Sequence, residues 1–308
     1  MRARLLLLSA VVLWGWTFVA TKVLVTELGP IEIFALRLAL GLPFLGGILL
    51  LRRVRVRFER SDLRALLAGG AIFTTHFLIQ IQGLTTTTAS NTGWIISVSP
   101  LVLAVLSFAV LGERLGRSTL AGIGVATFGV LLLVSRGRIA DFAWLRSTGD
   151  WLVLGSAVTW ACYTVTTRDL ARRRNPLAVT FGILLVAAAM TTVLAILVQA
   201  ALGAEAGSAQ VAAPASFASV DLSRVRHLSP RGIVALLYLA IPGLALGQWF
   251  WQEGVAALGA SRAGVFLYLE PIATILLAVP LLGEPFGPIT ALGGGLVLAG
   301  VYVGQRGR

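Results

Sequence analysis

Ten apolar stretches, each about as long as a membrane is thick, divide this 308-residue chain. An α-helix rises ~1.5 Å per residue, so about 20 apolar residues cross a hydrocarbon core of ~30 Å. Short polar turns separate most of the stretches. The pattern predicts ten transmembrane helices, at 5–26, 31–51, 63–83, 88–111, 117–135, 149–168, 177–200, 231–253, 261–282 and 288–305. Residues 201–230 are rich in Ala and Ser, and we expect an extramembrane loop there, with room for a short surface helix.

The apolar pattern also occurs twice. SPLVLAVLSFAVLGERLG at 99–116 has the Pro, Gly and Glu positions of EPIATILLAVPLLGEPFG at 270–287, 171 residues later. At an offset of 146, SAVVLWGWTFVATK at 9–22 matches GSAVTWACYTVTTR at 155–168. Five helices per copy is an odd number, so the second copy enters the membrane in the opposite direction. We therefore expect an all-α integral membrane protein of two inverted five-helix repeats, residues 1–135 and 149–305, joined by a linker at 136–148.

Composition and charge place this bundle in a bilayer. The chain is 57% hydrophobic and 12% charged, against about 25% charged for a soluble domain. With the N-terminus inside, seventeen basic residues fall on the side of the termini. Seven fall on the other side, namely Lys22, Arg136, Arg138, Arg146, Arg224, Arg226 and Arg231. The positive-inside bias then predicts a protein of the plasma or inner membrane with both termini cytoplasmic. Because topology accounts for the net charge of +12, no nucleic-acid partner is expected.

Several stretches are similar to a known family. WGWTFVATK, the arginine of FALRLALGLPF, and the two Pro…Gly-Glu stretches with the apolar runs after them resemble the EamA branch of the drug/metabolite transporter superfamily. The resemblance implies a ten-helix exporter of small metabolites, often amino acids. It also implies a central cavity lined by helices 1, 3, 4, 6, 8 and 9.

Enzyme and cofactor chemistry find little support in the residues. HExxH and GxSxG do not occur, and no Cys/His cluster has the spacing of a zinc site. An intramembrane enzyme and a receptor-like scaffold are the remote alternatives, and transport by the purified protein would separate them from a carrier. We expect no cofactor and no metal, a small-molecule cargo, and a monomer or weak homo-oligomer in the bilayer.

Four charged residues lie within or at the ends of the spans, and two of them, Arg37 and Glu270, have two interpretations each. Arg37 lies in the middle of span 2, where it either attracts an anionic group or ties helix ends through backbone carbonyls, the role that the resemblance favours. Glu270 precedes Pro271 within span 9, as a proton-coupling carboxylate or as an anchor for the kink. Glu113 and Glu284 end matching turns and are expected to brace the following helix.

A binding site near midplane is predicted from aromatic and uncharged polar residues. Trp14 and Trp160 match in the repeat and lie deep in their helices, whereas Trp249 and Trp251 suit an interface belt. His76 shares a helix face with Gln80, although a lone intramembrane histidine is often a packing residue. The full expected substrate-binding set is Trp14, His76, Gln80, Trp94, Trp160, Tyr163, Gln248 and Tyr268.

An amphoteric cargo with an apolar side chain suits this mixture. The sequence thus predicts export of neutral or aromatic amino acids, or of similar metabolites, by alternating access. The alternative is a proton-coupled multidrug or other metabolite permease, for which Glu270 is the candidate acid.

Overall fold

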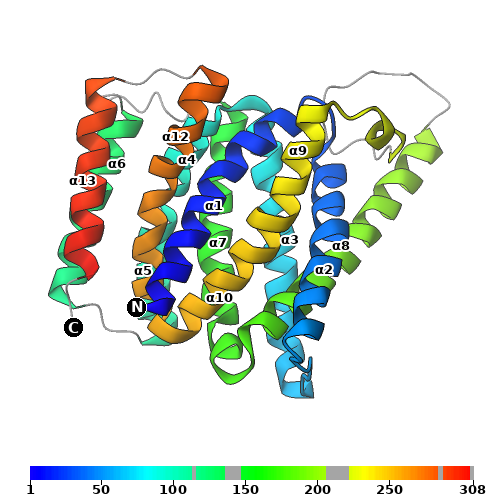
Figure 1. The fold of residues 1–308 in the computed structure, drawn as a ribbon, viewed down its shortest axis with the longest axis horizontal. Coiled ribbons are helices and arrows are strands. Elements are labelled where there is room, and N and C mark those ends of the chain that lie inside the picture. Colours follow the sequence, from blue (N-terminus) through cyan, green and yellow to red (C-terminus); the bar gives the residue numbers. More distant parts are fainter. Residues whose placement is uncertain (113–115, 136–146, 206–221, 284–286, 306–308) are drawn as a thin grey trace.

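The chain forms a bundle of helices that run along one common direction (Figure 1). The structure is a computed structural model and describes residues 1–112, 116–135, 147–205, 222–283 and 287–305. Within these ranges every regular element is helical. The α-helices are α1 (Arg2–Leu24), α2 (Pro30–Leu51), α3 (Leu63–Thr86), α4 (Ala89–Ile96), α5 (Ser99–Leu111), α6 (Arg117–Val134), α7 (Thr148–Arg173), α8 (Pro176–Glu205), α9 (Pro230–Tyr238), α10 (Gly247–Leu258), α11 (Ala260–Gly264), α12 (Glu270–Leu282) and α13 (Pro288–Gln305).

Shorter helical segments connect or interrupt these helices. A 3-10 turn, η1 (Arg60–Asp62), leads into α3, and another, η2 (Leu222–His227), precedes α9 within the expected 201–230 loop. The π-helical η3 (Leu239–Leu246) joins α9 to α10, and the 3-10 segment η4 (Val265–Leu269) joins α11 to α12. Glu113, Glu284, residues 136–146 of the expected linker and residues 206–221 of the loop lie outside the described residues.

Helix ends follow local sequence chemistry. Pro30 and Pro230 occupy first-turn positions, where the missing N–H of proline has no helical partner to lose. Ser147 and Ser229 cap α7 and α9 through side-chain oxygens that accept backbone N–H bonds. At the other end, Gly112 and Gly283 terminate α5 and α12 in the left-handed conformation, with φ of 64° and 66°.

Two spans are broken near their middles at equivalent places. Between α4 and α5, Ser97 and Val98 bond three residues back, to Trp94 and Ile95. At the junction of η4 and α12, the Glu270 N–H donates to Leu267 O. In a continuous α-helix the Leu267 carbonyl would accept from the N–H of residue 271, but Pro271 has no N–H. The shorter 3-10 bond from the Glu270 N–H takes its place. The helix breaks thus place the N-termini of α5 and α12 inside the bundle.

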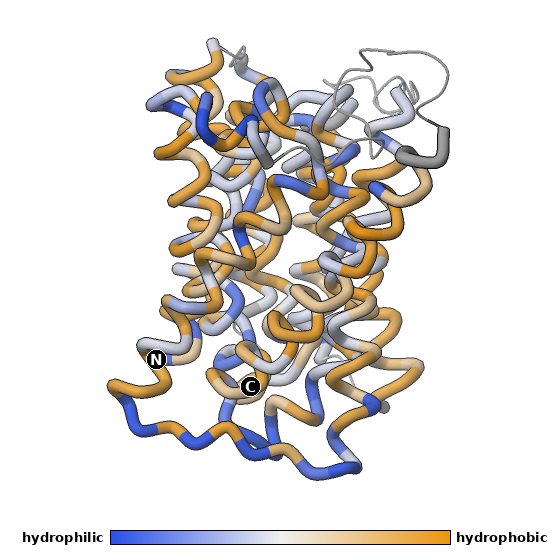
Figure 2. Tube along the Cα trace, turned by 90° about the vertical axis from the view of Figure 1, so that its right-hand side faces the viewer, coloured by the Kyte–Doolittle hydropathy of each residue, from blue (hydrophilic) through white to orange (hydrophobic). Residues whose placement is uncertain are grey.

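Hydropathy confirms a membrane protein. Seven helical segments are long and apolar enough to span a bilayer, whereas α6 and α13 contain shorter apolar stretches, Arg117–Leu132 and Ala291–Gly304. Apolar side chains cover much of the outside, and Figure 2 shows the hydrophilic residues concentrated at the end where both termini lie. The ten predicted spans correspond to helical segments of the structure, although α7 is too polar to be among the seven.

The polar character of α7 is explained by its position inside the bundle. It packs against α3, α4, α5 and α10. Its hydroxyl side chains bond to carbonyls one turn earlier in the same helix, as Ser156 does to Val153 O and Thr164 to Trp160 O. These bonds satisfy the hydroxyl groups without water. Because α7 faces other helices on most sides, little of its surface has to be apolar for contact with lipid.

Candidate functional site

A cavity lies in the centre of the bundle, at the depth of the broken helices. Its volume is about 20 Å³, the room of one or two water molecules. No lining residue is more than 7% exposed, so the cavity lies among buried side chains. The lining residues are Trp14, Thr17, Phe18, His76, Phe77, Gln80, Ile96, Trp160, Gln248 and Glu270. They come from α1, α3, α4, α7, α10 and α12, which correspond to the six spans that the resemblance implies.

Two tryptophans, Trp14 and Trp160, line the cavity, and Trp251 packs against both of them. The ring of Trp14 meets the ring of Trp160 edge to face, with centroids 4.8 Å apart, and Trp251 lies 5.4 Å from Trp14 and 5.7 Å from Trp160. The Trp14 indole donates to Gly243 O at 2.9 Å, within the π-helical segment η3. In η3 the Gly247 N–H bonds five residues back to Pro242 O, a shift that π-helical turns produce and that is frequent at functional sites.

His76 and the two glutamines supply uncharged polar groups. The His76 Nδ1 lies 2.8 Å from Ser156 O, and because a carbonyl only accepts, this nitrogen carries the hydrogen. In the neutral ring Nε2 is then an acceptor. Gln248 is 1% exposed and neither its Oε1 nor its Nε2 has a hydrogen-bond partner. An unpaired buried amide next to a cavity is a group that a polar ligand can satisfy.

The one acidic residue on the cavity wall is Glu270, the first residue of α12. It is 6% exposed, and within the described residues its carboxylate makes no hydrogen bond or ion pair. Its backbone carbonyl accepts from the Thr274 hydroxyl at 2.9 Å. An acid at this wall that has no partner in the described part of the chain can bind either a proton or a cationic group.

Arg37 is buried near this wall but does not line it. Its guanidinium carbon lies 4.5 Å from the centroid of the Phe77 ring, and Phe77 is a lining residue. Neither Nε nor Nη2 has a hydrogen-bond partner. The structure therefore shows no arginine–carbonyl bonds of the kind that a helix-tying role requires, within the residues it describes.

Three of the expected binding residues lie off the cavity wall. Trp94 and Tyr268 pack in a separate apolar cluster with residues of α6 and α13, and the Tyr268 hydroxyl is 2.8 Å from that of Thr127. Tyr163 lies behind Trp160, with ring centroids 5.2 Å apart, and its hydroxyl accepts from Gln252 Nε2 at 2.7 Å. Of the other expected residues, Trp14, His76, Gln80, Trp160, Gln248 and Glu270 are brought together.

Sequence reasoning missed five residues at or next to the site. Thr17 and Phe18 follow Trp14 by three and four positions, and Phe77 precedes Gln80 by three, so helical spacing was the available signal. Ile96 immediately precedes the break after α4. The interface-belt interpretation of Trp251 is wrong, since it is fully buried. The 171-residue offset equates Trp251 with Gln80 and would have placed it at cavity depth.

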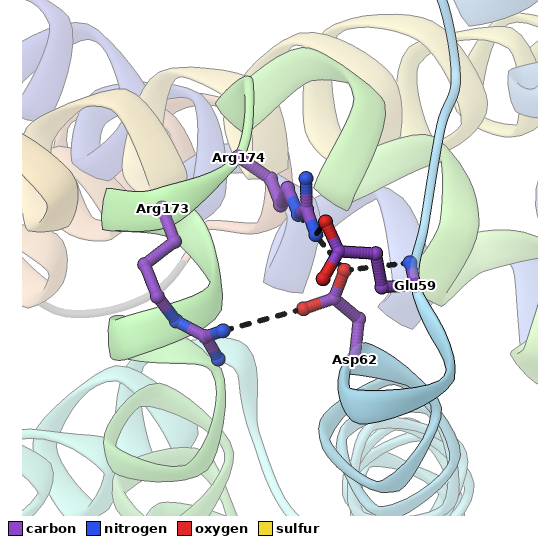
Figure 3. A network of polar contacts seen from close by, with 4 residues as sticks. All are labelled: Glu59, Asp62, Arg173 and Arg174. Atoms are coloured by element: carbon purple, nitrogen blue, oxygen red, sulfur yellow. Dashed lines mark hydrogen bonds and ion pairs between the residues drawn. The ribbon is translucent and has the colours of Figure 1, made fainter.

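An ionic network ties α7 to the start of α3, at the end of the bundle where the termini lie (Figure 3). Asp62 accepts from Arg174 Nε at 2.8 Å and lies 3.5 Å from Arg173, and Arg174 also pairs with Glu59 at 2.5 Å. The hydrogen bond to Glu59 raises the pKa of the Arg174 guanidinium above its ordinary value. The Asp62 side chain is fully buried and also accepts the Glu59 N–H at 2.9 Å, so the network fixes both segments.

At the other end of the bundle, a second tie joins α1 to α9. Glu27 accepts from the backbone N–H of Ser229 at 2.8 Å and from its hydroxyl at 2.7 Å. Lys22 donates to Leu84 O and Thr87 O, which joins α1 to the end of α3. Each end of the bundle is thus secured by polar contacts of its own.

A helical membrane bundle that encloses a polar and aromatic cavity at mid-depth is the architecture of a membrane transporter. The EamA-like transporter family matches residues 1–135 and 147–304 of this chain. The chain belongs to this family, and it is a transporter and not an enzyme.

Curated relatives match nearly the whole chain. An uncharacterized transporter of Archaeoglobus fulgidus is 27% identical over 98% of this chain and 96% of its own length. A probable amino-acid metabolite efflux pump of Salmonella typhimurium is 26% identical over 98% and 94%, and a probable terminal-alkyne amino-acid exporter of Streptantibioticus cattleyicolor is 28% identical over 97% and 92%. A crystal structure at 22% identity aligns with a TM-score of 0.74, covering 99% of this chain and 98% of that one, and supports the fold.

Proposed function

We propose that this protein exports small metabolites, foremost neutral or aromatic amino acids, by alternating access of the central cavity. The observation that carries the proposal is the buried cavity between the two halves. Its lining combines Trp14 and Trp160 with Glu270 and with the Gln248 amide, which has no hydrogen-bond partner among the described residues. An aromatic or aliphatic side chain fits the tryptophan wall, and the polar head satisfies the unpaired groups. The names of the two amino-acid exporters among the relatives point the same way.

Reciprocal contacts support two inverted five-helix repeats. When a residue of one half meets a residue of the other, their equivalents also meet, as a two-fold axis requires. On α6 and α13 the contacts run in opposite directions along the two helices, which favours an axis across the bundle over one along it. The close pairs are Gly122 with Gly300 and Gly129 with Gly293, Gly93 with Thr274 and Gly264 with Leu103, and Gly83 with Val153 and Gly254 with Leu7.

Helix bounds give independent support for the repeat. Between the halves, α5 and α12, and likewise α6 and α13, begin and end at residues 171 positions apart. Both helix breaks obey the same offset, and Pro30 and Pro176 start α2 and α8 at the offset of 146. Ten spans in two repeats also put both termini at one end, as in Figure 1.

The arginines favour a cytoplasmic position for that end. The segment between α2 and α3 carries five arginines, at 52, 53, 55, 57 and 60, and the α7 end carries Arg172, Arg173 and Arg174. The ion pairs to Asp62 place the two groups together. A cluster of this sign next to short loops is retained on the cytoplasmic side.

The small cavity implies that helices move during transport. A volume of about 20 Å³ cannot hold an amino acid, so the cavity has to enlarge before cargo can bind. Two helix groups are joined by close contacts and end ties, α3 with α7 and α1 with α9 and α10. The Lys22 bonds to the end of α3 link the two groups at one end of the bundle and must break when that end opens. We propose that these groups rock against each other at the Trp14–Trp160 contact and open the cavity to one side at a time.

Transport by purified protein in liposomes tests the proposal. Radiolabelled phenylalanine or leucine should exchange across the membrane, and Trp160→Ala or His76→Ala should abolish exchange with near-normal yield and thermal stability. Trp151→Ala is the matched control, because Trp151 is on the same helix but 59% exposed. Normal transport by both cavity variants would place the cargo site elsewhere. Aggregation of both would assign these residues to packing.

A second candidate is proton-coupled export of cationic compounds, favoured by the unpaired Glu270 carboxylate on the cavity wall. An acid that binds either a proton or a cation couples the two movements. Under this function a lipophilic cation, and not phenylalanine, should be exchanged by the wild type, and Glu270→Gln should uncouple its export from the proton gradient. Exchange of phenylalanine without exchange of cations rejects this candidate.

A further inference from the structure

Arg37 is a buried charge without a polar partner. The side chain is on α2 and 1% exposed, and among the described residues it makes no hydrogen bond or ion pair. Its one characterised contact is the face of Phe77, with 4.5 Å between the guanidinium carbon and the ring centroid. A cation–π contact is weaker than the charge-assisted hydrogen bonds that a guanidinium can form. A cation buried in this way is completed by an anion that binds later.

Phe77 separates this cation from the cavity. Phe77 lines the cavity, and the Arg37 guanidinium, which is not a lining group, lies over the Phe77 ring. The ring also stacks on Phe34, with centroids 5.3 Å apart and planes 14° apart. The cavity is too small for a cargo, so a lining side chain has to leave the wall when cargo enters. Displacement of Phe77 enlarges the cavity and at the same time exposes the guanidinium.

We propose that Arg37 binds the carboxylate of the cargo once Phe77 has moved aside. A planar guanidinium matches a carboxylate with two parallel hydrogen bonds. Glu270, on the cavity wall and without a partner, is then available for the ammonium group of the same molecule. The inference rests on the proposed function for the amino acid itself, but the site accepts any small carboxylate with an apolar group.

The asymmetry of the two halves supports a ligand role. At the offset of 146 the equivalent of Arg37 is Ile183, a fully apolar core residue. A residue needed only to hold the repeated packing would have a counterpart in the other half. Arg37 has no such counterpart. One arginine in one half of the protein is what the binding of a single anionic head group requires.

Binding to the purified protein in lipid nanodiscs tests the inference, with tryptophan fluorescence as the signal because Trp14 and Trp160 line the cavity. The three ligands are phenylalanine, phenylalaninamide, which lacks the carboxylate, and 3-phenylpropionate, which lacks the ammonium. We expect the wild type to bind both acids, and phenylalanine about ten- to a hundredfold more tightly than its amide. Equal affinity for phenylalanine and its amide, or no binding of either acid, overturns the inference.

Arg37→Gln should remove most of the preference for the acids and leave the affinity for the amide within about twofold. The matched control is Arg52→Gln, since the Arg52 guanidinium lies 4.6 Å from the Trp249 ring centroid and Trp249 does not line the cavity. The control should bind all three ligands as the wild type does. A uniform loss for all ligands in Arg37→Gln, with unchanged thermal stability, contradicts a carboxylate-specific role.

Phe77→Leu keeps the test decisive if Arg37→Gln does not fold. A smaller side chain uncovers Arg37 and also enlarges the cavity for all three ligands, so the affinity for both acids should rise several-fold more than that for the amide. An equal change for acids and amide overturns the inference. If 3-phenylpropionate binds through Arg37 but phenylalanine is not transported, the proposed function fails and the carboxylate site stands. If phenylalanine is transported and the amide binds with the same affinity as phenylalanine, the proposed function stands and the carboxylate site at Arg37 fails.

Discussion

The contact between α6 and α13 depends on glycines whose replacement has a calculable effect. A β-carbon on Gly122 would lie 2.5 Å from Gly300 O and from two backbone atoms of Gly304, about 1 Å inside ordinary contact distance. Backbone atoms cannot rotate away as a side chain can. The two helices must therefore separate, and overpacking of this kind costs about 1–3 kcal/mol.

Gly124 provides the matched control for this prediction. It is two residues along the same helix, and a β-carbon there would meet nothing within 4 Å. Alanine gains about 1 kcal/mol of helix propensity over glycine at both sites, so the difference between the variants isolates the clash. Gly122→Ala should be about 1–3 kcal/mol less stable than Gly124→Ala in reversible unfolding in mixed micelles.

Equal unfolding free energies for the two alanine variants would refute the close approach of α6 and α13. Gly129→Ala extends the test, because its β-carbon would lie 2.8 Å from Gly293 O, at the reciprocal contact. A destabilisation at Gly122 without one at Gly129 would contradict the two-fold relation between the halves.

Reporter fusions after Arg60 and within residues 204–220 should report opposite compartments, with Arg60 cytoplasmic, and the same compartment for both would contradict ten spans. Asp62→Asn should lower the thermal midpoint more than Glu59→Gln, since the Asp62 side chain is fully buried and that of Glu59 is 69% exposed. High salt should shrink the Glu59 effect more than the Asp62 effect, and the opposite order would contradict the network. Gly112→Ala should destabilise by about 1 kcal/mol at its φ of 64°, whereas a neutral effect in the unfolding assay would argue against the left-handed helix end.

The helix pattern could be predicted from apolar length, and its repetition from matched prolines and glycines. Pro100 and Pro271 are first-turn residues of α5 and α12, and the glycines of both turns end the helices. These features depend on local chemistry, such as the missing N–H of proline and the left-handed backbone of glycine. These effects depend on neighbouring residues in the sequence and not on the surroundings of the helix, so they can be predicted from the sequence alone.

The direction of individual side chains was less predictable. Trp94 and Ile96 are two residues apart on α4, about 200° around the helix, so only one of them can face the cavity. The cavity receives Ile96, and Trp94 packs toward α6 and α13. Depth in the membrane does not distinguish the two residues, and hydropathy does not tell which of them faces a cavity. The difference arises from how α4 is rotated against its neighbours, which tertiary packing sets.

The contact of Arg37 with Phe77 is a second feature beyond the reach of sequence patterns. The two residues are on different helices, and their approach depends on how α2 lies against α3. The sequence identified Arg37 as unusual because of its depth. Its lack of a polar partner, which distinguishes a ligand group from a helix tie, required the coordinates.

The reciprocal glycine contacts also bear on the energetics of a transport cycle. Three close contacts between the halves recur at equivalent residues. Under the proposed alternating access, packing lost when one end of the bundle opens therefore has an equivalent that can form at the opposite end. The two open forms then differ in free energy chiefly through residues without a counterpart, such as Arg37 and Glu270. A carrier with nearly equal end states spends comparable time open to each side, and the concentration gradient of its cargo decides the direction of net flow.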